Sequence, residues 1–126
     1  MANIKNFAVV DLFCGIGGLT HGFIKENFIV SAGVDFDNSC CYAYETNNGS
    51  KFVYKDVTNL TTEELNELYP NNLRKILVGC APCQHFSIFN HKNNNNVEKQ
   101  AKDQKWKLLY SFAELIERIQ PEIVSM

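Results

Sequence analysis

The sequence lacks long hydrophobic runs, a secretion signal and an excess of positive charge. No apolar run approaches the ~20 residues of a membrane-spanning helix, and the N-terminus lacks the charged-then-apolar layout of a signal peptide. The 12 Lys and Arg residues stand against 14 Asp and Glu residues, whereas a domain that binds duplex DNA by itself is usually basic. We therefore expect a cytoplasmic chain that is not a self-sufficient DNA-binding domain.

Internal repeats are also absent, and the 7 Gly and 3 Pro residues are too sparse to form a linker between domains. With 126 residues the chain has the length of one domain at most. A hydrophobic content of 45% excludes general disorder. The 5 cysteines are an odd number in a chain without an export signal, which favours reduced thiols over a disulfide framework.

Apolar runs and helical patterns alternate along the chain. The runs predict strands at 7–10, 28–34, 52–54, 76–78 and 123–124. Helical spacing predicts helices at 19–27, at 38–47, from a capping sequence at 61–64, and along an apolar stripe at 108–119. This alternation predicts an α/β fold, with a parallel sheet, right-handed crossovers and helices on both faces.

Three local predictions accompany this assignment. The Asn-rich stretch 90–102 has low helix and strand propensity, which predicts a mobile loop. The first helix is expected to bury Leu19, Phe23 and Ile24. Gly49 is expected to end the second helix, because glycine is the common residue just beyond a helix end.

A glycine-rich turn follows the first predicted strand. Gly15, Gly17 and Gly18 allow a sharp turn and a close approach of backbone to a ligand, at the N-terminus of the next helix. Asp35 lies 20 residues beyond Gly15, where a carboxylate commonly accepts hydrogen bonds from a ribose. The pattern indicates an adenosine-containing cofactor, and a glycine-lined turn without a ligand is the alternative. A nicotinamide dinucleotide is disfavoured because Thr20 stands where its fingerprint has a third glycine.

The segment after the fourth predicted strand, residues 79–87, allows three chemistries. Cys80 and Cys83 have the spacing of a dithiol redox centre, although no amphipathic helix follows them. Cys80, Cys83 and His85 could contribute to a zinc site, although a second ligand pair at finger spacing is missing. The third possibility is that Cys83 is a nucleophile and Cys80 a small buried residue.

The order of these motifs resembles that of the DNA (cytosine-5)-methyltransferases. Asp-Leu-Phe-x-Gly-x-Gly-Gly at 11–18 is similar to the family's first motif, Asp35-Phe36-Asp37 to its second, and Pro82-Cys83-Gln84 to its signature motif. The resemblance extends from Phe7 to Met126. It implies a Rossmann-like fold that binds S-adenosyl-L-methionine, with a partial parallel sheet.

The resemblance also implies roles for individual residues. Cys83 would be the catalytic nucleophile, and Gln84 and Ser87 would contact DNA. Asp56 would lie beside the adenine, with the capping of a helix or turn as its alternative. The implied cofactor-binding residues are Phe13, Gly15, Ile16, Gly17, Gly18, Asp35, Phe36, Asp56, Val57 and Pro82.

Several parts of such an enzyme are missing from the sequence, among them the family's Glu-Asn-Val motif and its target-recognition domain. We therefore expect residues 1–126 to be the N-terminal part of a methyltransferase catalytic domain, inactive by itself. The complete enzyme would act on double-stranded DNA, with a cognate restriction endonuclease in a bacterial restriction–modification system. A tRNA cytosine-5 methyltransferase and a non-catalytic methyltransferase-like module are the alternatives.

Overall fold

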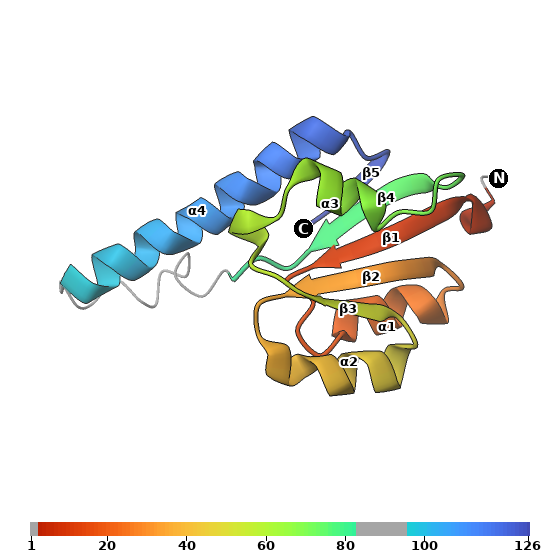
Figure 1. Ribbon diagram of the computed structural model, residues 1–126, viewed down its shortest axis with the longest axis horizontal. Coiled ribbons are helices and arrows are strands. Elements are labelled where there is room, and N and C mark those ends of the chain that lie inside the picture. The colour runs from red at the N-terminus through yellow and green to blue at the C-terminus, as the bar shows by residue number, and fades with distance from the viewer. Residues whose placement is uncertain (1–2, 83–95) are drawn as a thin grey trace.

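The computed structural model describes residues 3–82 and 96–126, apart from the side chains of 96–103 and 105. Its centre is a parallel sheet in the order β3-β2-β1-β4-β5 (Figure 1). The strands are β1 (Phe7–Leu12), β2 (Ile29–Asp35), β3 (Lys51–Tyr54), β4 (Arg74–Gly79) and β5 (Ile123–Ser125). All five predicted strands are confirmed. β1 is buried along its whole length, as expected for a central strand that is covered on both faces.

Helices cover both faces of the sheet, as predicted (Figure 1). On one face lie α1 (Gly18–Lys25) and α2 (Cys41–Asn48), and on the other lie α3 (Thr62–Glu67) and α4 (Asn96–Ile119). Short 3-10 helices precede β1, α2 and α3 at η1 (Ile4–Asn6), η2 (Asn38–Cys40) and η3 (Val57–Asn59). Phe23 and Ile24 of α1 pack against the β1 and β4 side chains of one face. Phe112, Leu115 and Ile119 of α4 pack against the other.

Two helix boundaries follow the predicted local chemistry. The Thr61 hydroxyl accepts a hydrogen bond from the Glu64 N–H at 3.1 Å, and the Glu64 carboxylate accepts one from the Thr61 N–H at 2.9 Å. This reciprocal capping box begins α3. Gly49 ends α2 with a φ of 60°, a left-handed conformation that glycine adopts without strain.

The prediction of a loop at 90–102 is wrong for residues 96–102, which form the first turns of α4, and its residues 90–95 lie outside the described residues. The apolar stripe in the second half of α4 packs on the sheet and provides a helical nucleus. Extension from a nucleus costs much less than a new start. Residues 98–102, Glu-Lys-Gln-Ala-Lys, are also good helix formers. The strongly polar asparagines at 93–96 therefore obscured a helix that begins at Asn96.

Two burial predictions are also wrong. Leu19 is 42% exposed, and Thr20 is the buried residue in the first turn of α1. Thr20, Phe23 and Ile24 share one helix face through their i, i+3 and i+4 spacing, and this face leaves Leu19 at its edge. Cys80 is exposed because β4 has its last paired residue at Gly79. Within the described residues, no helix combines the length and apolarity that a membrane span requires.

Candidate cofactor site

The sheet topology brings the predicted site residues to one edge. β1 lies between β2 and β4, so successive connections leave the sheet in opposite directions at this point. Ligands of open parallel sheets bind beyond the carboxyl ends of the strands at such a switch point. Leu12 pairs with both Val34 and Gly79, and Asp35 pairs with Tyr54. The segments that follow these strand ends contain the described cofactor-binding candidates.

The glycine turn between β1 and α1 needs glycine at one position above all. Gly17 has a φ of 90°, and a Cβ there would lie 2.4 Å from Asn48 Nδ2 and 2.7 Å from Tyr44 Cδ2. Only glycine fits so close an approach of the turn to α2. Gly15 also has a left-handed φ, of 51°, but a Cβ there would meet no atom of the described residues within 4 Å. The turn is therefore held tightly at Gly17 and lies open at Gly15.

Phe13 has a φ of 59°, a strained conformation for a residue with a bulky side chain. Its ring packs edge-on against Phe112 of α4, with 6.4 Å between the ring centroids. The next residue, Cys14, donates its backbone N–H to the Val34 carbonyl at 3.1 Å. These contacts fix the entry to the turn, and such overdetermined strain is found mostly at ligand sites.

Asp35 closes the glycine turn from β2. Its Oδ2 accepts a hydrogen bond from the Gly15 N–H at 2.8 Å, and its Oδ1 accepts one from the Asp37 N–H at 2.9 Å. The expected ribose contact stays a prediction, and each oxygen keeps a lone pair for it. A phosphate would need the Gly15 N–H that Asp35 already takes, and it would meet a carboxylate. The turn is thus poorly suited to an anion.

Asp11 places a second carboxyl group beneath the turn, with only 1% of the residue exposed. Its Oδ2 accepts a hydrogen bond from the Thr20 hydroxyl at 2.8 Å, and its Oδ1 has no hydrogen-bond partner among the described residues. Burial raises the pKa of Asp11 to about 6, with a smaller contribution from the negative charge of Asp35 and an opposing one from Thr20. Two acidic groups in one turn favour a ligand that carries positive charge.

Asp56 has the capping role that the sequence left open. It caps η3: its Oδ1 accepts hydrogen bonds from both the N–H and the hydroxyl of Thr58, each at 2.8 Å. Val57 is 4% exposed and packs in the core on the α3 and α4 face. The adenine contact expected of Asp56 and Val57 stays a prediction. Capping by one oxygen of Asp56 is compatible with it.

Large apolar side chains are exposed at the same edge. Ile16 of the turn and Phe36, directly after β2, are each 65% exposed, and Pro82 is half-buried. Exposed apolar side chains that are grouped together often mark a ligand surface. The contacts of Ile16, Phe36 and Pro82 with a cofactor stay predictions, as do those of Phe13 and the glycines.

The four cysteines that the structure describes, Cys14, Cys40, Cys41 and Cys80, are free thiols. Cys14 is buried, and burial with the nearby charges of Asp11 and Asp35 raises the pKa of its thiol, so it remains an unreactive thiol. Cys83, Gln84 and Ser87 lie outside the described residues, as does His85 of the zinc alternative. Among the residues that are described, no cluster of three metal-ligating side chains occurs.

Comparison with known proteins identifies the family to which this chain belongs. A sequence profile for C-5 cytosine-specific DNA methylases matches residues 7–126. The chain belongs to this family. It is 54% identical over 119 residues to the type II methylase M.HgiDII of Herpetosiphon aurantiacus, a match that covers 94% of this chain and 32% of the relative. It is 29% identical over 114 residues to the type II methyltransferase M.FnuDI of Fusobacterium nucleatum, covering 90% and 30% of the two chains.

Solved structures agree with the family fold. One, described as a DNA modification methyltransferase encoded within a prophage of E. coli, aligns with a TM-score of 0.73 and 27% identity, over 94% of this chain and 31% of the other. Dnmt2 of S. pombe aligns with a TM-score of 0.68 and 18% identity, over 94% and 34% of the chains, and supports the fold alone. The chain spans about a third of the length of the curated relatives cited above. The predicted Rossmann-like methyltransferase fold is confirmed.

The methylase fold contains functional candidates that the sequence interpretation missed. Asp11 belongs to the first motif but received no role. Thr20 served only as evidence against a dinucleotide, and Tyr44 received no role. A polar residue on the buried face of α1, nine residues after a buried Asp, was the available signal. Tyr44 joins this pair, with 3.1 Å between its hydroxyl and that of Thr20.

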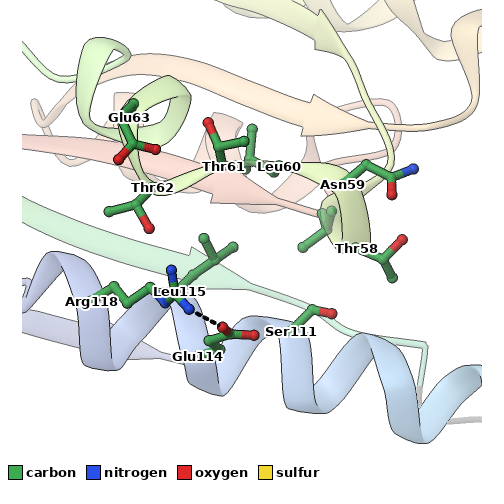
Figure 2. A pocket seen from close by; sticks show the side chains of 11 residues that line it. Thr58, Asn59, Leu60, Thr61, Thr62, Glu63, Ser111, Glu114, Leu115 and Arg118 are labelled. Carbon is green, nitrogen blue, oxygen red and sulfur yellow. Dashed lines mark hydrogen bonds and ion pairs between the residues drawn. The ribbon is translucent and has the colours of Figure 1, made fainter.

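The methylase fold also has a cavity of about 300 Å³ on the opposite face, between the η3–α3 segment and α4 (Figure 2). Val57 is one of its lining residues, and most of the others have polar side chains, including Thr58, Ser111 and Glu63. Among the described lining residues Arg118 is the only basic one, and it already pairs with Glu114, with 2.5 Å between the charged atoms. The cavity therefore has no convergent charge, and we assign no chemistry to it.

Proposed function

We propose that this chain forms the cofactor-binding and nucleophile-bearing part of a DNA cytosine-5 methyltransferase, which transfers the methyl group of S-adenosyl-L-methionine to carbon 5 of cytosine. The observation that carries the cofactor assignment is the hydrogen bond from the Gly15 N–H to Asp35 at 2.8 Å. It makes the glycine turn acidic rather than anion-binding, and buried Asp11 adds a second carboxyl group. A cationic sulfonium suits this turn, whereas the pyrophosphate of a nicotinamide dinucleotide does not.

Each described part of the turn has a proposed task. Gly15, Gly17 and Gly18 let the backbone approach the amino-acid end of the cofactor. Asp35 accepts hydrogen bonds from its ribose through the lone pairs that Gly15 and Asp37 leave free. The side chains of Phe13, Ile16, Phe36 and Pro82 exclude water, while Asp56 and Val57 border the adenine. The bound cofactor supplies an electrophilic methyl group.

The nucleophile in this proposal is Cys83. Carbon 5 of cytosine is too weakly nucleophilic to attack a methyl group unaided. The Cys83 thiolate would add to carbon 6, and the displaced electron pair would let carbon 5 bond to the methyl group while that group's bond to the donor sulfur breaks and leaves a neutral thioether. A base would then take the carbon-5 proton, the electrons of that C–H bond would re-form the ring double bond, and the bond between Cys83 and carbon 6 would break to release the thiolate. Covalent catalysis of this kind divides one difficult substitution into easier steps.

The target base must leave the duplex for this chemistry, at a cost of a few kcal/mol. In the proposal, Gln84 and Ser87 contact the DNA around the extruded base. The remainder of a longer protein supplies the base-contact glutamate, the target-recognition domain and most of the basic surface, since this chain has a net charge of −2. Residues 1–126 alone are then inactive.

The relatives suggest the biological setting. Those cited above are named as type II enzymes. In the proposal, the complete protein protects DNA against a cognate restriction endonuclease. We assign this role, double-stranded DNA as substrate and a cytoplasmic location to the complete protein. A tRNA substrate is the competing outcome of the assay described next.

Methyl transfer by the complete protein tests the proposal. Radiolabelled S-adenosyl-L-methionine is supplied with duplex DNA or with tRNA, and incorporation at carbon 5 of cytosine is measured. Cys83→Ser should abolish transfer and leave cofactor binding intact. Cys80→Ser is the matched control, because this neighbouring thiol is exposed and has no proposed role. Full turnover by Cys83→Ser would remove the nucleophile assignment, and label in tRNA alone would replace DNA as substrate.

A further inference from the structure

A chain of buried polar groups runs beneath the glycine turn. The Thr20 hydroxyl lies 2.8 Å from Asp11 Oδ2 and 3.1 Å from the Tyr44 hydroxyl. The Tyr44 hydroxyl lies 3.3 Å from the Ser50 hydroxyl, which donates to the Val30 carbonyl at 3.0 Å. The chain thus joins β1 to α1, α2 and β2 through four contacts.

Tyr44 is held in this position by backbone on two sides. A Cβ at Gly33 would lie 2.5 Å from the Tyr44 hydroxyl, and one at Gly17 would lie 2.7 Å from its ring. Tyr44 has no exposed surface, and its ring packs against Phe52 at 5.7 Å. The hydroxyl therefore has little freedom to turn to other partners, and its proton must serve either Thr20 or Ser50.

The four contacts need one proton more than the three hydroxyl groups possess. If Asp11 is ionised, Thr20 donates to Asp11, Ser50 donates to Val30, and Tyr44 can donate to only one of its two neighbours. One contact then joins two oxygens without a proton. If Asp11 is neutral, each group donates to the next, from Asp11 through Thr20, Tyr44 and Ser50 to Val30. The network is complete only with a proton on Asp11.

The surroundings of Asp11 also favour the neutral acid. Its Oδ1 is buried without a partner in the described part of the chain, and an unpaired oxygen costs less on a neutral acid than on a carboxylate. Asp35 on β2 and the Cys14 thiol in the turn are the nearby ionisable groups that interact with Asp11, with Tyr44 facing it from α2. His21, the ionisable neighbour of Thr20 on α1, is exposed. Burial raises the pKa of Asp11 to about 6 against the opposing hydrogen bonds from the Thr20 hydroxyl and backbone N–H, with a small contribution from Asp35. The carboxyl group is therefore neutral in mild acid and negatively charged at pH 7 to 8.

We propose that Asp11 is a specificity-determining residue, whose buried negative charge makes the turn prefer the cationic methyl donor over its neutral thioether product, and that Tyr44 controls when this charge is present. This inference rests on the proposed function, because it takes S-adenosyl-L-methionine as the ligand. The donor and its product, S-adenosyl-L-homocysteine, differ by one methyl group and one positive charge. A charge in a site shielded from water acts on that difference far more strongly than an exposed one.

The first test measures the charge of Asp11 without a cofactor. The side-chain carboxyl carbons of aspartate are labelled with carbon-13 in the complete protein, and their titration is followed by NMR, with Asp11→Asn used to assign the signal. Tyr44→Phe removes the contact that lacks a proton and should lower the pKa of Asp11 by about 1. Thr20→Val removes the donor to the carboxylate and should raise it. Thr20→Ser, which keeps the hydroxyl, is the control.

The second test compares the two ligands by calorimetry from pH 5 to pH 8. In the wild type, the ratio of donor affinity to product affinity should fall on the order of tenfold as the pH decreases through about 6. Asp11→Asn should give the low ratio at every pH. In Tyr44→Phe, the fall in this affinity ratio should occur at a pH about one unit lower than in the wild type. A role in folding alone would weaken both ligands alike and leave the ratio unchanged.

The outcomes separate the inference from the proposed function. A raised Asp11 pKa in Tyr44→Phe would overturn the proton count, and a wild-type ratio in Asp11→Asn at pH 8 would overturn the selectivity. If the wild type binds neither ligand, the proposed function fails, and the selectivity assigned to Asp11 fails with it. The carboxyl titration would still decide the proton count in that case.

Discussion

The close approach of the glycine turn to α2 predicts a large difference between two neighbouring glycines. In Gly17→Ala, the new methyl group would lie 2.4 Å from Asn48 Nδ2 and 2.7 Å from the Tyr44 ring. The left-handed backbone costs an alanine ~1–2 kcal/mol, and overpacking of a tight site costs ~1–3 kcal/mol more. We therefore expect Gly17→Ala to lower the free energy of unfolding by about 2–5 kcal/mol.

Gly15→Ala is the matched control for this prediction. Gly15 is also left-handed, with a φ of 51°, but its Cβ would meet nothing within 4 Å. It should therefore cost only the backbone component, about 1–2 kcal/mol. Gly18, in the first turn of α1, has neither problem, and Gly18→Ala should be neutral or slightly stabilising. Urea unfolding of the three variants, followed by circular dichroism, measures the differences. Equal losses for Gly17→Ala and Gly15→Ala would refute the claim that the turn rests against Tyr44.

Three further predictions concern stability. The pKa of Asp11 is about 6 in the folded chain and ordinarily 3.8, so between pH 3.8 and pH 6 the folded state binds a proton that the unfolded state does not. Protonation of Asp11 therefore stabilises the folded state at low pH, and this stabilisation is lost as the pH rises through 6. Relative to Asp11→Asn, the wild type should lose about 2.4 kcal/mol between pH 4 and pH 7 in urea unfolding, and parallel curves would contradict this. Thr61→Ala breaks the capping box and should cost about 1 kcal/mol, whereas its neighbour Thr62, which makes no such bond, should tolerate alanine; equal losses would argue against the cap. Tyr69→Phe removes the buried bond to the Ile76 carbonyl and should lower the free energy of unfolding by about 1–2 kcal/mol, with an unchanged midpoint as the contrary result.

The sequence predicted best those elements whose pattern and packing agree. The apolar run that became β1 is buried throughout, and the stripe that ends at Ile119 packs on the sheet as its spacing indicated. The prediction failed where local composition and tertiary packing disagree. The polar first turns of α4 have no apolar stripe of their own and follow a run of asparagines, so composition alone favoured a loop.

The site shows the same division between local pattern and spatial contact. Motif spacing identified the glycine turn and Asp35, because both are defined by their distance along the chain from β1. No spacing rule connects Asp11 to Tyr44, which is 33 residues away and meets it only through Thr20. Asp56 illustrates a further gap, since a capping aspartate and a ligand-binding aspartate look alike in a sequence.

The acidity of the turn resolves an ambiguity that glycines leave open. Glycine-rich turns at helix N-termini commonly present free N–H groups to phosphates, and the helix dipole assists them. Here the Asp35 carboxylate takes the Gly15 N–H, and Thr20, at the position of a third glycine, has its side chain turned inward to Asp11. Both features distinguish this turn from a phosphate-binding turn in the same way. The turn keeps the shape of a phosphate-binding turn, but carboxyl groups stand where such a turn offers free N–H groups. A ligand that shares the adenosine part with a dinucleotide but carries a cation in place of the phosphates is the one that this arrangement fits.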